Sequence, residues 1–117
     1  MMYRGYRYGA EQFNGHYCAY IEVPPGHPWH GRSYDEVEST TPHGDFTYEG
    51  WGIPPILKHS FRTDDDSFWL GWDYAHFGDY FIEGLDITGK KWTRAEVEAH
   101  ARAVIDEAIE AHAGAAK

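Results

Sequence analysis

The sequence has a single cysteine, Cys18, and no long apolar run. One thiol cannot form a disulfide within its own chain, which is typical of a protein of a reducing compartment. No stretch reaches the roughly 20 apolar residues of a transmembrane helix, and the first residues show no apolar segment of a secretory signal. We therefore expect a cytoplasmic protein without a membrane partner.

Basic residues are also scarce, because ten Lys and Arg stand against nineteen Asp and Glu and give a formal net charge of −9. An acidic surface repels phosphate backbones, so we do not expect general nucleic-acid binding. Hydrophobic residues, in contrast, make up 42% of the 117 residues and aromatic residues 17%. That content is enough for one hydrophobic core, and we expect a single domain over residues 1–117.

The clearest predicted element is a C-terminal amphipathic helix over about residues 94–113. Thr93 and Glu96 have the spacing of a capping box at its start. Apolar residues then recur at spacings of three and four, which indicates one apolar stripe: Val97, Ala101, Val104, Ile105, Ala108 and Ile109. A helix of this kind covers a sheet.

Strands and long loops are predicted before the helix. Residues 17–23 and 68–72 have the composition of strands, and residues 46–48 form a short strand candidate that ends before Gly50. Ser33 and Glu36 suggest a single helical turn. The order predicts an α+β fold: a small antiparallel or mixed β-sheet with long loops, covered by the C-terminal helix. Long loops in a small domain are more often functional than not.

Three loop segments combine His, acidic and aromatic side chains with glycine, which lets a ligand approach the backbone. Their sequences are Gly-His-Pro-Trp-His-Gly at 26–31, Pro-His-Gly-Asp-Phe-Thr-Tyr at 42–48, and Trp-Leu-Gly-Trp-Asp-Tyr-Ala-His-Phe-Gly-Asp at 69–79. These segments are the candidate site.

The three segments resemble those of a family of small, mostly uncharacterised proteins encoded by phages and prophages. Its members carry G-H-P with a nearby Gly and Tyr, then H-G-x-x-T, then W-x-x-G-x-D-x-A-H-x-G-D. The matching residues are Gly26, His27, Pro28, Gly31, Tyr34, His43, Gly44, Thr47, Trp69, Gly71, Asp73, Ala75, His76, Gly78 and Asp79. Asp45 departs from the family, which has a second Gly there. The resemblance implies a phage setting in the host cytoplasm and implies no reaction.

Two chemical hypotheses use the same four residues. His43, Asp73, His76 and Asp79 could supply nitrogen and oxygen ligands to a transition metal. Their spacings match no established metal motif, so neither a metal nor another cofactor is predicted. Alternatively, His43 and His76 could act as acid and base, oriented by Asp73 or Asp79, and cleave a ligand by hydrolysis. Water or a hydroxyl group of the substrate would attack, because the sequence offers no candidate nucleophile beyond Thr47 and Cys18, and Cys18 lies in an apolar run.

Ligand binding without chemistry is the hypothesis we favour from the sequence. Its candidate residues are His27, Trp29, His30, Thr47, Tyr48 and Trp72. Aromatic rings that stack on a nucleobase contribute roughly 1–3 kcal/mol each. Trp29 and Trp51, flanked by Gly and Pro, are expected to be exposed, whereas Trp69 is expected in the core.

The resulting prediction is a phage-encoded accessory protein that binds a small nucleotide-like ligand, such as an immune signalling molecule. The phage and anti-defence part of this prediction rests on the resemblance alone. Two alternatives stay open: a hydrolase or phosphodiesterase that cleaves such a ligand, and an acidic protein–protein inhibitor without a small-molecule site. Exposed sheet edges would also allow a homo-oligomer.

Overall fold

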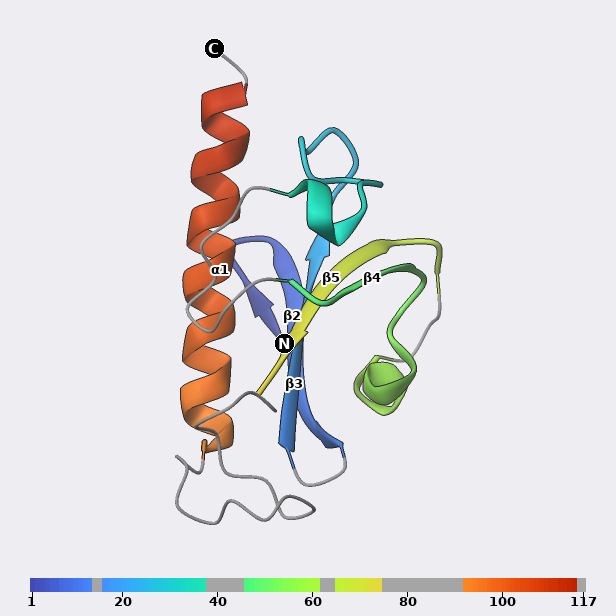
Figure 1. Ribbon diagram of the computed structural model, residues 1–117, viewed down its shortest axis with the longest axis vertical. Helices are drawn as coiled ribbons and strands as arrows, with labels where there is room; N and C mark the ends of the chain where they lie inside the picture. The colour runs from blue at the N-terminus through green and yellow to red at the C-terminus, as the bar shows by residue number, and fades with distance from the viewer. Residues whose placement is uncertain (14–15, 38–45, 62–64, 75–91, 116–117) are drawn as a thin grey trace.

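The computed structural model describes residues 1–13, 16–37, 46–61, 65–74 and 92–115 (Figure 1). In these ranges a five-stranded antiparallel sheet has the order β1-β2-β3-β5-β4. The strands are β1 Met2–Tyr3, β2 Tyr6–Phe13, β3 His16–Val23, β4 Tyr48–Trp51 and β5 Phe68–Asp73; two 3-10 helices, η1 Tyr34–Glu36 and η2 Pro55–Ser60, and the helix α1 Arg94–Ala115 complete the elements. The predicted α+β fold is confirmed, with an antiparallel sheet.

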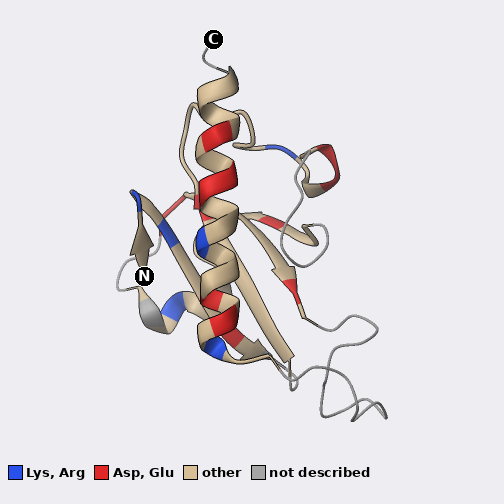
Figure 2. Cartoon of the chain, turned by 90° about the vertical axis from the view of Figure 1, so that its left-hand side faces the viewer, with Lys and Arg blue, Asp and Glu red and all other residues tan. Residues whose placement is uncertain are grey.

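Helix α1 begins at the predicted residue and lies along one face of the sheet (Figure 1). Its capping box is formed: the Thr93 N–H donates to the Glu96 carboxylate at 3.0 Å, and the Glu96 N–H donates to the Thr93 hydroxyl at 3.2 Å. Five residues of the predicted stripe are fully buried: Val97, Ala101, Val104, Ile105 and Ala108. Acidic positions recur along the helix, with Arg positions between them (Figure 2). No helix in the described ranges is long and apolar enough to cross a membrane.

The strand predictions at 17–23 and 68–72 are confirmed, and each strand is one residue longer. The prediction at 46–48 was wrong in its bounds, because β4 runs from Tyr48 to Trp51. Gly50 does not end it, since on an edge strand a glycine still pairs through its backbone, here with Trp69. Gly52, with a φ of +87°, ends the strand instead.

An N-terminal hairpin of β1 and β2 was not predicted. Arg4 and Gly5 join the two strands, and their φ angles of +50° and +88° are the positive values that a type I′ turn requires. Tyr6, Tyr8 and Ala10 alternate with polar or small residues and are buried. This alternation was the sequence pattern that could have revealed β2.

The two faces of the sheet are covered differently. The α1 face forms the larger core with the helix stripe, and includes Ile21, Leu70 and Trp72. On the opposite face Trp69 packs with Leu57 of η2 and with Ile53, which precedes η2. Gly9 on β2 allows Leu57 to approach the sheet closely, because a Cβ at that position would lie 2.9 Å from a methyl carbon of Leu57.

Candidate functional site

The first predicted loop segment is tied to α1 by His27. The His27 side chain is buried, and its Nδ1 accepts a hydrogen bond of 3.0 Å from the Trp29 N–H. The proton therefore sits on Nε2, which donates to the Ala108 carbonyl at 2.8 Å. Burial lowers the pKa of His27, and this keeps the imidazole neutral. With both ring nitrogens engaged, His27 holds the loop against the helix.

The tryptophans divide between core and surface. Trp29 is 6% exposed, so the expectation that it is exposed was wrong. Its ring packs against the rings of His27 and Phe46, whose centroids lie 5.0 and 5.8 Å from its own. Trp72 is 1% exposed and belongs to the same core. Trp69 in the core and Trp51 on the surface, at 62% exposed, are confirmed. In the described arrangement, neither Trp29 nor Trp72 offers a free ring face to a ligand.

The side chains of the other predicted ligand residues make their own contacts, although the His30 N–H donates to the His27 carbonyl at 3.0 Å. His30 is half-buried. Its ring packs against the rings of Trp51 and Phe68, with centroid distances of 5.2 and 5.5 Å. Thr47 is exposed, and its N–H donates to the Gly71 carbonyl at 2.8 Å. The structure therefore distributes these residues over the core, the rim of the sheet and its opposite face, and their binding roles stay predictions.

Two predicted site residues, Tyr48 and Asp73, do share the sheet face opposite α1. Tyr48 and Tyr20 both lie beside Gly71, and their rings meet edge to face at 5.2 Å. A Cβ on Gly71 would lie 2.5 Å from the Tyr20 ring, so the glycine makes room for it. Asp73 pairs with Cys18, and burial, followed by the charge of Asp73, raises the pKa of that thiol to about 11.

Three of the four predicted catalytic residues, His43, His76 and Asp79, lie outside the described residues. Acid–base catalysis with Asp73 therefore stays a prediction. Within the described ranges no group of three or more His, Cys, Asp or Glu side chains is placed to hold a metal ion.

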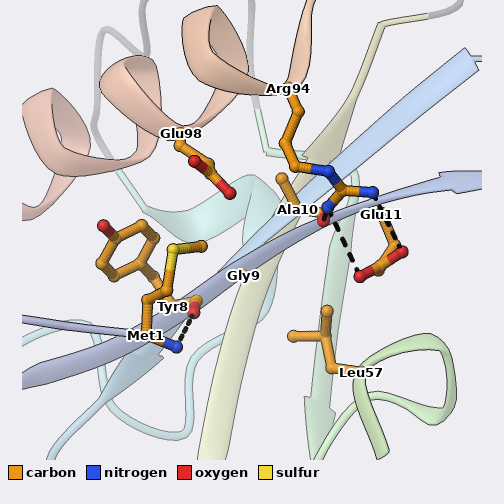
Figure 3. A pocket seen from close by; sticks show the side chains of 8 residues that line it. All are labelled: Met1, Tyr8, Gly9, Ala10, Glu11, Leu57, Arg94 and Glu98. Atoms are coloured by element: carbon orange, nitrogen blue, oxygen red, sulfur yellow. Dashed lines mark hydrogen bonds and ion pairs between the residues drawn. The ribbon is translucent and has the colours of Figure 1, made fainter. Parts of the chain in front are cut away.

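A pocket of about 400 Å³ opens at the edge of β2, between η2 and the first turns of α1 (Figure 3). Its volume falls within the roughly 300–1,000 Å³ of small-molecule sites. Its lining residues are Met1, Tyr8, Gly9, Ala10, Glu11, Leu57, Arg94 and Glu98. We call it the edge pocket. None of the site residues predicted from the sequence lines it.

The edge pocket exists because β1 covers only part of β2. Tyr8 exchanges two backbone hydrogen bonds of 3.0 Å with Met1, which places Tyr8 at the outer edge of the sheet. Backbone groups alternate in direction along a strand, so those of Ala10 also point outward, past the end of β1. The Arg94 guanidinium donates to the Ala10 carbonyl there. The uncovered edge thus becomes the floor of a cavity closed by helix side chains.

Charged groups of both signs surround this floor. Arg94 and Glu98, one turn apart on α1, reach toward β2 in Figure 3, and Leu57 approaches from η2. The guanidinium also lies 3.4 Å from each carboxylate oxygen of Glu11. The pocket therefore offers carboxylate acceptors and one planar cation around a floor of strand backbone, with apolar side chains beside it. Sequence reasoning missed it, because Arg94 and Glu98 look like ordinary surface residues of a helix and Glu11 lies on the unpredicted strand.

Comparison of the chain with family models, with curated proteins and with solved structures gave no match. The resemblance to phage proteins therefore stays a prediction. The geometry of the described residues is what supports a function.

Proposed function

We propose that the protein binds a small nucleotide-like ligand in the edge pocket. One observation carries this proposal: Arg94 lies beside Glu11 and within one helical turn of Glu98 around a cavity of about 400 Å³ whose lining has both polar and apolar groups. A ligand that matches this arrangement has an aromatic or apolar body, several N–H or O–H donors and one anionic group.

A nucleoside monophosphate has this chemistry. Its base would lie against Met1, the apolar lining residue that is 46% exposed, since a thioether side chain packs well on an aromatic ring. Exocyclic amino groups and ribose hydroxyls would donate to the carboxylates. Arg94 would turn from Glu11, whose carboxylate oxygens lie at a long 3.4 Å, to the phosphate, because the guanidinium fork fits phosphate oxygens with two parallel hydrogen bonds.

The carboxylates limit how many phosphates the ligand carries. Glu11 and Glu98 already face the two cations of the pocket lining, the Arg94 guanidinium and the Met1 ammonium, so no positive charge is in excess and each added phosphate brings negative charge without a partner. We therefore expect monophosphates, or nucleotides whose phosphates are shared in diester bonds, to bind better than triphosphates. Signalling nucleotides of host defence belong to the second group, and the resemblance to phage proteins favours a role in holding such a molecule.

Binding rather than cleavage is the activity proposed. The eight residues that line the edge pocket include no His, Cys, Ser or Thr. A pocket lined in this way has no imidazole for proton transfer near neutral pH and no serine, threonine or cysteine nucleophile, and the hydroxyl of its one tyrosine, Tyr8, accepts a hydrogen bond from Arg102. The bound ligand should therefore be recovered unchanged.

The test is calorimetric titration with nucleosides, nucleoside monophosphates, triphosphates, ADP-ribose and cyclic dinucleotides. We expect monophosphates or cyclic dinucleotides to bind, and intact ligand to be recovered after heat denaturation. Glu98→Gln should weaken binding about tenfold or more, because a hydrogen bond to a charged group contributes roughly 1.5–3 kcal/mol. Arg94→Lys keeps the charge and loses the fork, so it should weaken phosphate binding selectively.

Glu110→Gln is the matched control, since Glu110 is an exposed acid on the same helix outside the pocket. It should bind like the unaltered protein. The proposal fails if no ligand binds at about 1 mM, a concentration that corresponds to about −4 kcal/mol of binding free energy. It also fails if Glu98→Gln and Glu110→Gln bind equally well, because the ligand would then lie elsewhere.

A further inference from the structure

The other edge of the sheet carries an exposed tryptophan that is held in place. Trp51 on β4 is 62% exposed. Its ring packs against the rings of His30 and Phe68, with centroid distances of 5.2 and 5.0 Å. The ring also lies beside Gly31, where a Cβ would be 3.5 Å from it. The side chain therefore presents a large apolar surface in a fixed orientation. Fixed aromatic side chains of this kind dominate protein–protein binding energy.

Within the part of the chain that the structure describes, no strand pairs with the outer edge of β4, which leaves its backbone available to a further strand. β4 is the last strand in the sheet order, and the Gly52 N–H donates to the Ser67 carbonyl of the preceding segment at 2.6 Å. Because backbone direction alternates, Gly50 and Tyr48 also face β5, whereas the N–H and C=O groups of Glu49 and Trp51 point away from the sheet. An extended peptide can pair with such an edge.

The charge around this edge is acidic. The Glu49 carboxylate accepts the Tyr34 N–H at 3.1 Å, which fixes η1 beside β4. η1 contributes Asp35 and Glu36, both exposed, and its Tyr34 ring is itself 42% exposed. Arg32 lies 4.0 Å from Glu36 and is the neighbouring cation. Three acids and two exposed aromatic rings thus surround the open edge.

We propose that the β4 edge binds an extended segment of a partner protein that carries Lys or Arg. The segment would add a strand beside Glu49 and Trp51, with a cationic side chain over the Trp51 indole and others near the carboxylates. A second copy of this chain is a poorer occupant, because two chains of net charge −9 repel each other. This surface does not involve the edge pocket, so the two proposals stand independently.

The test uses three short synthetic peptides of equal length. The Lys–Val peptide alternates Lys and Val, the Glu–Val peptide alternates Glu and Val, and the third is the Lys–Val peptide with its central residue replaced by proline. Calorimetry at low ionic strength should show binding of the Lys–Val peptide at least about tenfold tighter than that of the other two. Charge complementarity separates the first two peptides, and the loss of a backbone donor separates the third. Binding should weaken with added salt.

Trp51→Ala should weaken Lys–Val binding about tenfold or more, and Trp51→Phe by less, since the ring is retained. Met2→Ala is the matched control, because Met2 is an equally exposed apolar side chain on β1, at 65%. Circular dichroism verifies that both Trp51 variants fold. The proposal is overturned if no peptide binds at about 1 mM, if the Glu–Val peptide binds equally, or if Trp51→Ala has no effect. Sedimentation that shows the chain associating with itself through Trp51 would identify a second copy as the occupant, and would also overturn it.

Discussion

The two faces of the sheet differ in what packs against them. On the α1 face β2, β3 and β5 contribute buried apolar side chains, and the helix stripe completes one continuous core. On the opposite face the described residues form a smaller cluster, in which Leu57 of η2 packs with Trp69 and against Gly9, and the side chains of Cys18, Tyr20 and Asp73 lie on this same face. The difference teaches that the fold is stabilised mainly from one side. The other side and the two edges are left to carry polar chemistry.

Truncation of one buried side chain on each face is the strongest way to test this comparison. Ile105→Ala on α1 should lower the free energy of unfolding by about 4 kcal/mol, and Leu57→Ala on η2 by about 2 kcal/mol, near the two ends of the range for such cavities. The smaller value is expected because η2 can settle onto the sheet, whereas α1 is held along its length. Urea denaturation gives both values, and equal losses would contradict the comparison.

The reactivity of Cys18 tests how well the less covered face excludes water. Its thiol pKa is raised to about 11 from the ordinary 9.0, mainly by burial. At pH 8 the thiolate fraction, and with it the rate of alkylation by iodoacetamide, should be about a hundredfold lower in the folded protein than in guanidinium chloride. Asp73→Asn should speed the folded-state reaction by removing a nearby negative charge. A folded rate equal to the unfolded one would mean that Cys18 is solvated.

A methyl group on Gly9 tests how closely η2 packs on the sheet. Because a Cβ there would lie 2.9 Å from Leu57, Gly9→Ala should destabilise the protein by about 1 kcal/mol through overpacking. In a Leu57→Ala background the same change should cost little or nothing, since the clash is gone. A double-mutant cycle measures this coupling. Additive losses would show that the close contact does not exist in solution.

The smallest expected effect is the pH dependence of the free energy of unfolding that arises from His27, which is bonded to α1. The pKa of His27 is lowered, chiefly by burial and further by the neighbouring His112 and His30. The unfolded chain therefore binds a proton that the folded chain does not. The free energy of unfolding should fall as pH drops below about 6.5, the ordinary pKa, and level off below the folded pKa. His27→Gln should flatten this slope, and an unchanged slope in that variant would contradict the assignment to His27.

Elements set by local patterns could be predicted from the sequence. The capping box and stripe of α1 are short-range, and so are the β-branched and aromatic runs of β3 and β5. The hairpin at Arg4 and Gly5 was missed because its turn lacks the Asn-Gly or Asp-Gly pair that usually marks a type I′ turn.

The sites could not be predicted, because they depend on tertiary neighbours. The edge pocket joins Glu11, Leu57 and Arg94, which are far apart in the chain. Tyr48 and Asp73 share a face only because strand register places Tyr48 beside Gly71. The two hydrogen bonds of the His27 ring also join distant segments, since they tie its loop to α1, and its binding role stays a prediction.

The order of strands has a consequence for how the chain folds and varies. β3 and β5 are neighbours at the centre of the sheet, yet residues 24–67 separate them, and Val23 pairs with Phe68. The hairpin of β2 and β3 needs only a short closure, so we expect it to form early and the β3–β5 pairing to limit the rate. Doubling such a connection adds only about 0.6 kcal/mol of closure entropy. Related chains can therefore lengthen or rewrite the segment between these strands while the sheet persists.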